Sequence, residues 1–162
     1  MTTETPATRA LATSGILHTI TEHGPVRSLE EAAAARGIEP SQLLKTMVVR
    51  RGEGDFLLVL VPGDRQISWP KLRAHLGVSR LSMPDKDVAL AVTGYERGTI
   101  TPFGAHPEPG GAPLPVIADA LITSRPGPVS IGAGAHGLGA TMDPADLVAT
   151  LAAEVVDVTE PA

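Results

Sequence analysis

The amino-acid sequence predicts one α+β domain in which a turn-rich sheet is combined with short helices. A length of 162 residues corresponds to about one domain, at roughly 150 residues per domain. The chain has 43% hydrophobic and 19% charged residues, a globular composition. Its 17 glycines and 15 prolines are too many for a helical bundle. Strand and helix patterns are interspersed without regular βαβ alternation or a linker, which favours one mixed domain.

Local signals predict the elements of the first part of the chain. An apolar stripe predicts a helix over residues 7–22, which the following Gly-Pro pair would end. A Ser-x-x-Glu capping box opens an alanine-rich helix over 28–37, and a proline begins a helical turn at 40–43. Two apolar runs on either side of Gly-Glu-Gly predict a hairpin of strands 45–51 and 56–61.

Prolines near helix starts and glycines near helix ends delimit the later elements. The expected elements are helices 70–76, 85–93 and 143–151, an extended piece at 80–83, and strands 116–122, 129–131 and 154–158. Residues 95–115 are rich in glycine and proline and are expected to form a long loop. A loop of that length is usually functional or disordered.

Several classes of protein are excluded by what the sequence lacks. Without cysteine there is no disulfide, thiolate nucleophile or cysteine-based metal site. No histidine pair has i, i+4 spacing and no HExxH motif occurs, so we expect no metal and no cofactor. No apolar run reaches the ~20 residues that span a bilayer, and the N-terminus does not resemble a signal peptide. We therefore expect a cytoplasmic protein without membrane contact.

The formal net charge of -5 argues against a general nucleic-acid coat, but positive charge is concentrated in one segment. Between residues 45 and 80, seven basic residues face three acidic ones, a local net charge of +4. This segment is either a solvated charged face or a contact for a phosphate backbone. The basic residues are Lys45, Arg50, Arg51, Arg65, Lys71, Arg73 and Arg80.

Three local features are candidates for a site. Residues 132–137 read GxGxxG after a strand, but Pro144 would break a helix beginning among those glycines, so a glycine-rich turn is favoured over a dinucleotide site. Lys45 shares a strand face with Met47 and Val49, so it is either an edge lysine or one lining a pocket for an anionic or carbonyl oxygen. The GxxxP segment 98–102 either lets a ligand approach the backbone or simply connects two elements.

Four segments together resemble the YbaK family, the free-standing relatives of the editing domain inserted in bacterial prolyl-tRNA synthetases. The resemblance covers about residues 15–158, so we expect residues 1–162 to form one YbaK-like domain with that core. The segments are Leu43-Leu-Lys-Thr-Met-Val-Val49, Thr93-Gly-Tyr-Glu-Arg-Gly-Thr-Ile-Thr-Pro-Phe-Gly104, Leu114-Pro-Val-Ile-Ala-Asp119 and Gly134-Ala-His-Gly-Leu138.

The resemblance implies a mixed, mostly antiparallel, barrel-like sheet surrounded by helices, and hydrolysis of the ester between a wrong amino acid and tRNA. The family's required lysine maps onto Lys45, and its GxxxP loop, which lies against the terminal adenosine, maps onto Gly98 to Pro102. Lys45 and Gly98 are the expected catalytic residues. The expected substrate-binding residues are Thr46, Thr99, Ile100, Thr101, Pro102, Gly134, His136 and Gly137.

Two departures from the family leave the substrate open. The cysteinyl-specific branch has a tyrosine where this chain reads His18 to Glu22, and a basic residue where this chain has His136. A small amino acid such as cysteine or alanine on tRNA-Pro is the expected substrate. The alternative is a non-catalytic regulator that binds tRNA or a small molecule. Expected partners are aminoacyl-tRNA and an aminoacyl-tRNA synthetase, with a monomer and a homodimer both open.

Overall fold

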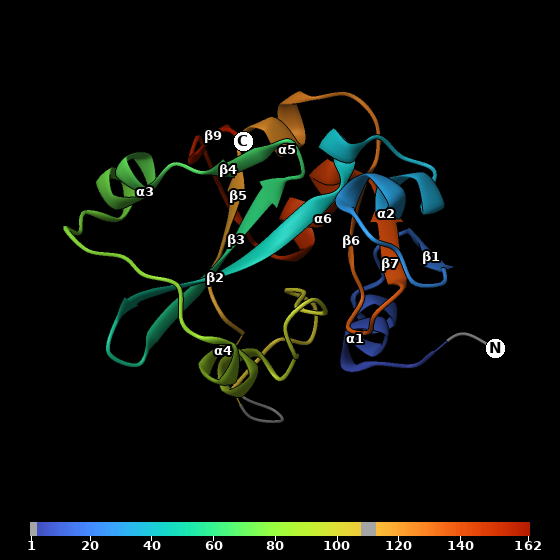
Figure 1. The fold of residues 1–162 in the computed structure, drawn as a ribbon, viewed down its shortest axis with the longest axis horizontal. Helices are drawn as coiled ribbons and strands as arrows, with labels where there is room; N and C mark the ends of the chain where they lie inside the picture. The colour runs from blue at the N-terminus through green and yellow to red at the C-terminus, as the bar shows by residue number, and fades with distance from the viewer. Residues whose placement is uncertain (1–2, 108–112) are drawn as a thin grey trace.

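The fold is built from nine strands and six α-helices, in a computed structural model that describes residues 3–107 and 113–162. The longest feature is the antiparallel hairpin of β2 (Leu44–Gly52) and β3 (Asp55–Pro62), which crosses the centre of Figure 1. β5 (Val116–Asp119) and β8 (Glu154–Val156) add to it in parallel, giving the order β2-β3-β5-β8. β2 is therefore an edge strand.

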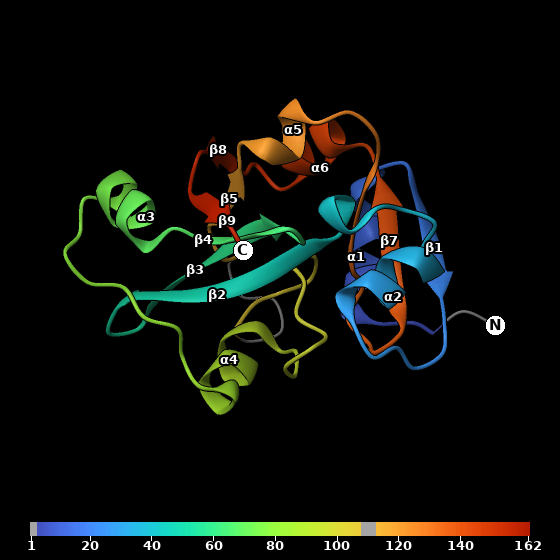
Figure 2. The same cartoon turned by 45° about the horizontal axis from the view of Figure 1, so that its top comes forward.

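A second sheet stands beside the first (Figure 2). It consists of β1 (His18–Glu22), β7 (Leu138–Met142) and β6 (Val129–Gly132), all antiparallel. A single bridge between Leu43 and Ser130 joins the two sheets at one corner. A third pair is β4 (Arg65–Ile67) with β9 (Thr159–Pro161). The predicted mixed, mostly antiparallel α+β fold is confirmed.

The four-stranded sheet is covered on both faces, which explains the unbroken apolar run of β3. One face, with Val48 and Leu60, packs with α1 (Pro6–Ser14), α4 (Lys86–Thr93) and the second sheet. The other face, with Val49 and Val59, packs with α3 (Trp69–Leu76) and β4. The remaining helices are α2 (Leu29–Ala35), the 3-10 turn Pro40–Gln42, α5 (Leu121–Ser124) and α6 (Pro144–Thr150).

Two predicted elements were wrong near the N-terminus and around β5. The helix predicted over 7–22 ends at Ser14, because Gly15 adopts φ +78°, and His18–Glu22 is a strand paired with β7. The strand predicted over 116–122 ends at Asp119, whose buried carboxylate accepts hydrogen bonds from the Leu121 and Val158 amides. That carboxylate thus holds the first residue of α5, Leu121, and the residue directly before β9, Val158.

The GxGxxG segment begins at the last residue of β6, Gly132, and continues as the predicted glycine-rich turn, in which no helix begins. The strand that follows, Leu138–Met142, was not predicted, nor were β4 and β9. Within the described residues, no helix is long and apolar enough to cross a membrane.

Gly63, in the turn between β3 and β4, allows the sheet to approach the 3-10 turn that leads into β2. A Cβ there would overlap Pro40 O and lie 2.8 Å from Leu29 Cδ2. We expect Gly63→Ala to lower the free energy of unfolding by about 1–3 kcal/mol through overpacking. Denaturant unfolding measures this, and Gly24→Ala, where a Cβ meets nothing within 4 Å, is the matched control. Equal stability of both variants would contradict the close packing.

Candidate functional site

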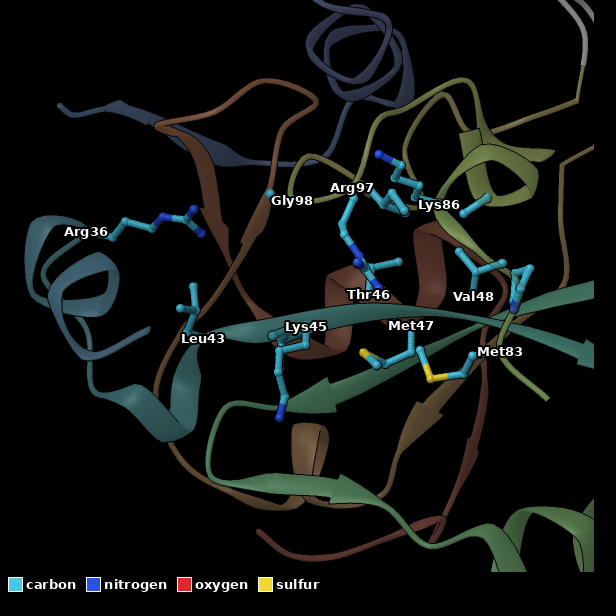
Figure 3. Close-up of a pocket in the computed structure, with 15 residues that line it drawn as sticks. Arg36, Leu43, Lys45, Thr46, Met47, Val48, Met83, Lys86, Arg97 and Gly98 are labelled. Carbon is cyan, nitrogen blue, oxygen red and sulfur yellow. The ribbon is translucent and has the colours of Figure 1, made fainter. Parts of the chain in front are cut away.

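A cavity of about 380 Å³ lies along the free edge of β2 (Figure 3). Its walls come from α2, β2, the turn before α4, α4 itself, residues 97–100 and β6. Segments that are far apart in the sequence therefore meet at one edge of the central sheet. Clefts of this kind, with a few polar groups among apolar walls, are the usual place for a small-molecule site.

The edge of β2 supplies unpaired main-chain groups to the cavity. On the edge away from β3, bridges to other described residues occur only near the two ends of β2, from Leu43 to Ser130 and from Arg50 to Ser82. The Arg50 amide and carbonyl both bond to Ser82, at 2.7 and 3.1 Å, and so point away from β3. Because this direction alternates along an antiparallel strand, the main-chain groups of Thr46 and Val48 point to the cavity side as well. They can hold a ligand through backbone hydrogen bonds.

Positive charge dominates the lining. Four of the lining residues are basic, namely Arg36, Lys45, Lys86 and Arg97, and among the described residues none that lines the cavity carries a carboxylate. Lys86 and Arg97 are exposed at the rim, whereas Arg36 and Lys45 are partly buried. Within residues 3–107 and 113–162, no group of three His, Asp or Glu side chains is placed to hold a metal ion. The cavity fits an anionic or strongly polar ligand.

Lys45 is one of the residues that line the cavity, but its ammonium lies on the other side of β2. Its Nζ donates to Arg65 O at 2.5 Å, and Figure 3 shows the ammonium on the opposite side of the strand from Thr46 and Gly98. The predicted face shared with Met47 and Val49 is confirmed, since both belong to the cluster on that side. Burial lowers the pKa of Lys45, and the nearby Asp64 carboxylate partly opposes this.

Hydrogen bonds within the loop after α4 hold the GxxxP segment in place. The buried Tyr95 hydroxyl donates to Phe103 O at 2.6 Å, and burial raises the pKa of Tyr95 to about 12. The Thr99 hydroxyl donates to Glu96 O at 2.8 Å. At Gly98 the backbone adopts φ +90°, and a Cβ there would lie 3.0 Å from Cε1 of His136. Gly98 thus lines the cavity, and the direction that a side chain would take from it leads to the His136 ring.

The residues predicted to form the site fall into two groups. Lys45, Thr46, Gly98 and Ile100 line the cavity together. The Thr46 hydroxyl oxygen is buried without a hydrogen-bond partner among the described residues. A buried polar atom without a partner suggests a site that a ligand or water completes.

The other predicted residues lie around the cavity without lining it. The Thr99 and Thr101 side chains are buried in the loop, and Pro102 lines a separate cavity near α1 and α6. Gly134 and Gly137 shape the β6–β7 turn. His136 is exposed on that turn, and its Nε2 lies 3.2 Å from Glu96 Oε1, an ion pair when the histidine is protonated.

The sequence reasoning did not identify three of the four cations, namely Arg36, Lys86 and Arg97. Arg36 follows an alanine-rich helix, where a basic residue is ordinarily explained by the helix dipole. Lys86 begins α4, and Arg97 lies inside the GxxxP region that was singled out for its glycine. Only Arg97 could have been recognised as a site residue from the sequence, because it directly precedes Gly98 of the GxxxP segment.

The chain is similar to known proteins of one family. The family model for the aminoacyl-tRNA editing domain matches residues 23–150. A proline–tRNA ligase of Geobacter sp. (strain M21) is 34% identical over 93 residues, which are 57% of this chain and 15% of the ligase. A proline–tRNA ligase of Thermosipho africanus is 34% identical over 80 residues, 49% of this chain and 14% of that ligase. The chain thus matches only a small part of these curated relatives.

Among solved structures, a candidate trans-editing enzyme for prolyl-tRNA synthetase has a TM-score of 0.85 and 27% identity. The alignment covers 98% of this chain and 99% of that one. A hypothetical protein with a TM-score of 0.84 and 24% identity shares the fold, over 96% of this chain and all of its own. The family match covers most of the chain and the structural match nearly all of it, so the protein belongs to the aminoacyl-tRNA editing domain family, as a YbaK-like member.

Proposed function

We propose that this protein is a trans-acting deacylase that hydrolyses the ester bond of mischarged aminoacyl-tRNA. The observation that carries the proposal is the cavity at the β2 edge, where Lys45, Thr46 and Gly98 of the family's motifs line one cation-rich space. The 3′ end of an aminoacyl-tRNA combines a phosphodiester chain, a ribose and an activated ester. A pocket with basic side chains and free main-chain groups suits each of these parts.

The chemistry needs no protein nucleophile, because an aminoacyl ester is activated. Water attacks the carbonyl carbon, the bond from that carbon to the ribose oxygen breaks, and a proton passes from the water to the departing ribose oxygen. The products are a free amino acid and uncharged tRNA. The neighbouring ribose hydroxyl of the substrate helps to position the water. Preorganised donors that face the developing oxyanion lower the barrier.

Lys45 is assigned to anchor the substrate and to stabilise the oxygen charge. Its ammonium rests on Arg65 O, so this role requires a change of side-chain rotamer across the edge of β2. A lysine side chain has the rotamer freedom for such a change. The main chain of residues 98–102 is assigned to the terminal adenosine, since Gly98 allows close approach.

The substrate we propose is a small amino acid, such as cysteine or alanine, on tRNA-Pro or a similar tRNA. The similarity to segments of proline–tRNA ligases supports the tRNA. A proline–tRNA synthetase is the synthetase partner that this implies, with the cytoplasm as the place of action. The second candidate is a non-catalytic regulator on the same fold, favoured by the resting position of Lys45 away from Gly98.

A deacylation panel tests the proposal. Purified protein is incubated with tRNAs charged with alanine, cysteine, serine, threonine or proline, and the loss of the ester is followed over time. Lys45-dependent hydrolysis of one or two of these substrates supports the deacylase. Binding of uncharged tRNA without hydrolysis of any ester would favour the regulator.

A second groove, at the far end of the β2–β3 hairpin, is assigned to the acceptor stem. It is lined by Arg50, Arg51, Arg73 and Arg80. Arg51 is paired with Asp55 at 2.9 Å, whereas Arg73 and Arg80 form no ion pair among the described residues. Both grooves lie along the same strand, so one RNA can follow β2 from its end to the cavity.

We expect Arg80→Gln to weaken tRNA binding and to reduce the slope of log K against log salt concentration by about 1. The reason is the loss of one phosphate contact and its released counterion. Filter binding at four salt concentrations measures the slope. Arg9→Gln, which removes an exposed arginine near Glu4, is the control. An unchanged slope in the Arg80 variant would remove this groove from the tRNA path.

A further inference from the structure

Arg36 lines the cavity in an environment that leaves its guanidinium incompletely bonded. Its main-chain amide caps α2 by donating to Ala32 O and Ala33 O. Its side chain extends towards β6, where Nη1 donates to Ser130 Oγ at 3.3 Å (Figure 3). The Nε atom is buried and has no hydrogen-bond partner among the described residues. A strong donor is thus held beside the cavity without an acceptor.

The charge of Arg36 is also uncompensated. None of the residues that line the cavity carries a carboxylate, and Arg36 forms no ion pair in the described parts of the chain. Burial lowers the pKa of its guanidinium, with no opposing contribution from an acid. Burying a charge without a partner is costly, and a bound water or ion is one explanation for a buried polar group without a partner.

The middle strand of the second sheet, β7, leaves room for the Arg36 guanidinium. A Cβ at Gly139 in β7 would lie 2.5 Å from Nε and 2.6 Å from Cζ of Arg36. Gly139 pairs with Gly132 of β6, which lines the cavity. Glycine inside a strand weakens the strand and often marks a close approach. The absence of a side chain at Gly139 therefore makes room for the Arg36 side chain against β7.

We infer that Arg36 binds the phosphate that joins the last two nucleotides of the tRNA, and so fixes the terminal adenosine in the cavity. This inference rests on the proposed function. The aminoacyl end itself offers no anion, because its carboxyl group is esterified and its amino group is positive. The nearest negative charge on the ligand is the 5′-phosphate of the terminal nucleotide. A guanidinium with free donors matches phosphate oxygens in charge and in geometry.

The first experiment uses inorganic phosphate and does not depend on catalysis. The Nε–Hε signal of Arg36 is identified in a proton–nitrogen correlation spectrum by its loss in Arg36→Gln. We expect this signal to shift saturably as phosphate replaces chloride at constant ionic strength. If it stays in place while signals of the arginine groove move, the inference is overturned.

The second experiment compares AMP with adenosine, which differ only in the phosphate. We expect wild-type protein to bind AMP about tenfold more tightly, from a hydrogen bond between charged groups. Arg36→Gln should bring the ratio close to 1, and so should Gly139→Ala, which keeps the charge but displaces the guanidinium. Arg27→Gln, at an exposed position before α2, should keep the wild-type ratio.

The outcomes separate this inference from the proposed function. A tenfold ratio that persists in Arg36→Gln overturns the role of Arg36, whereas the deacylation panel still decides the activity. If wild-type protein binds neither nucleoside nor nucleotide, the proposed adenosine site fails. The phosphate titration then decides independently whether Arg36 is an anion site.

Discussion

Replacing Lys45 with methionine is expected to lower kcat/KM for deacylation by about 100-fold or more, the effect of removing one donor that stabilises an oxyanion. Methionine keeps the apolar stem and removes only the ammonium. The folded state should be retained, since Nζ makes one hydrogen bond, to Arg65 O. Timed deacylation and thermal unfolding measure the two effects.

Lys71→Met is the matched control for Lys45→Met. Lys71 lies on α3, outside the cavity, where its ammonium is 3.0 Å from Asp157. We expect this variant to retain wild-type turnover. Full activity of Lys45→Met, with a folded protein, would remove the proposed mechanism. Equal losses in both variants would point to a general charge effect on tRNA binding.

The kinetic form of the Lys45 defect distinguishes its two assigned roles. If Lys45 anchors the ground state and the transition state equally, its loss raises KM and leaves kcat unchanged. A lysine that meets the developing oxyanion lowers kcat and kcat/KM together. The Lys45 ammonium must leave Arg65 O before it reaches the ester, so binding of the substrate and the chemical step can both depend on this lysine. Single-turnover rates measure the two steps separately.

Elements with signals inside their own sequence were predicted well. Ser28, Asp85 and Asp143 each cap a helix through a side-chain hydrogen bond, and Gly94 ends α4 as the sequence indicates. The β2–β3 hairpin follows from two apolar runs and a glycine turn. In these segments the residues that determine the structure are close together in the sequence.

Elements that depend on distant partners were missed. His18–Glu22 becomes a strand through pairing with Leu138–Met142, more than 100 residues away. Neither segment contains a local pattern that predicts this pairing. Leu138–Met142 contains glycine and alanine, which have low strand propensity, and its burial between two strands overrides that preference. Pairing of this kind is a tertiary effect that local patterns do not record.

The same distinction holds for the site. Lys45, Thr46, Gly98 and Ile100 belong to segments with recognisable motifs, and they meet in one cavity. Arg36 has no motif of its own. Its position depends on Ser130 and on the space left by Gly139, each about 100 residues further along the chain. Only the packing of α2 against β6 and β7 reveals that the guanidinium reaches the cavity.

Gly98→Val is expected to reduce deacylation by at least about 100-fold, because small displacements of positioning groups have effects of that size. The backbone at Gly98 adopts φ +90°, which a β-branched residue adopts only with strain. The added Cβ would also lie 3.0 Å from the His136 ring, and its methyl groups would enter the cavity or push that ring away. Deacylation rates and thermal unfolding are measured together.

Gly54→Val separates backbone strain from the loss of the site. Gly54 also has a positive φ, of +66°, but a Cβ there meets nothing within 4 Å. It lies in the hairpin turn, away from the cavity, so this variant should lose stability while its folded fraction remains active. If both variants lost activity in proportion to their stability, strain alone would account for Gly98. Replacing His136 by alanine in the Gly98→Val variant removes the contact between the valine and the His136 ring. If activity is lost only in Gly98→Val and is not restored by this second substitution, the effect lies in the cavity itself.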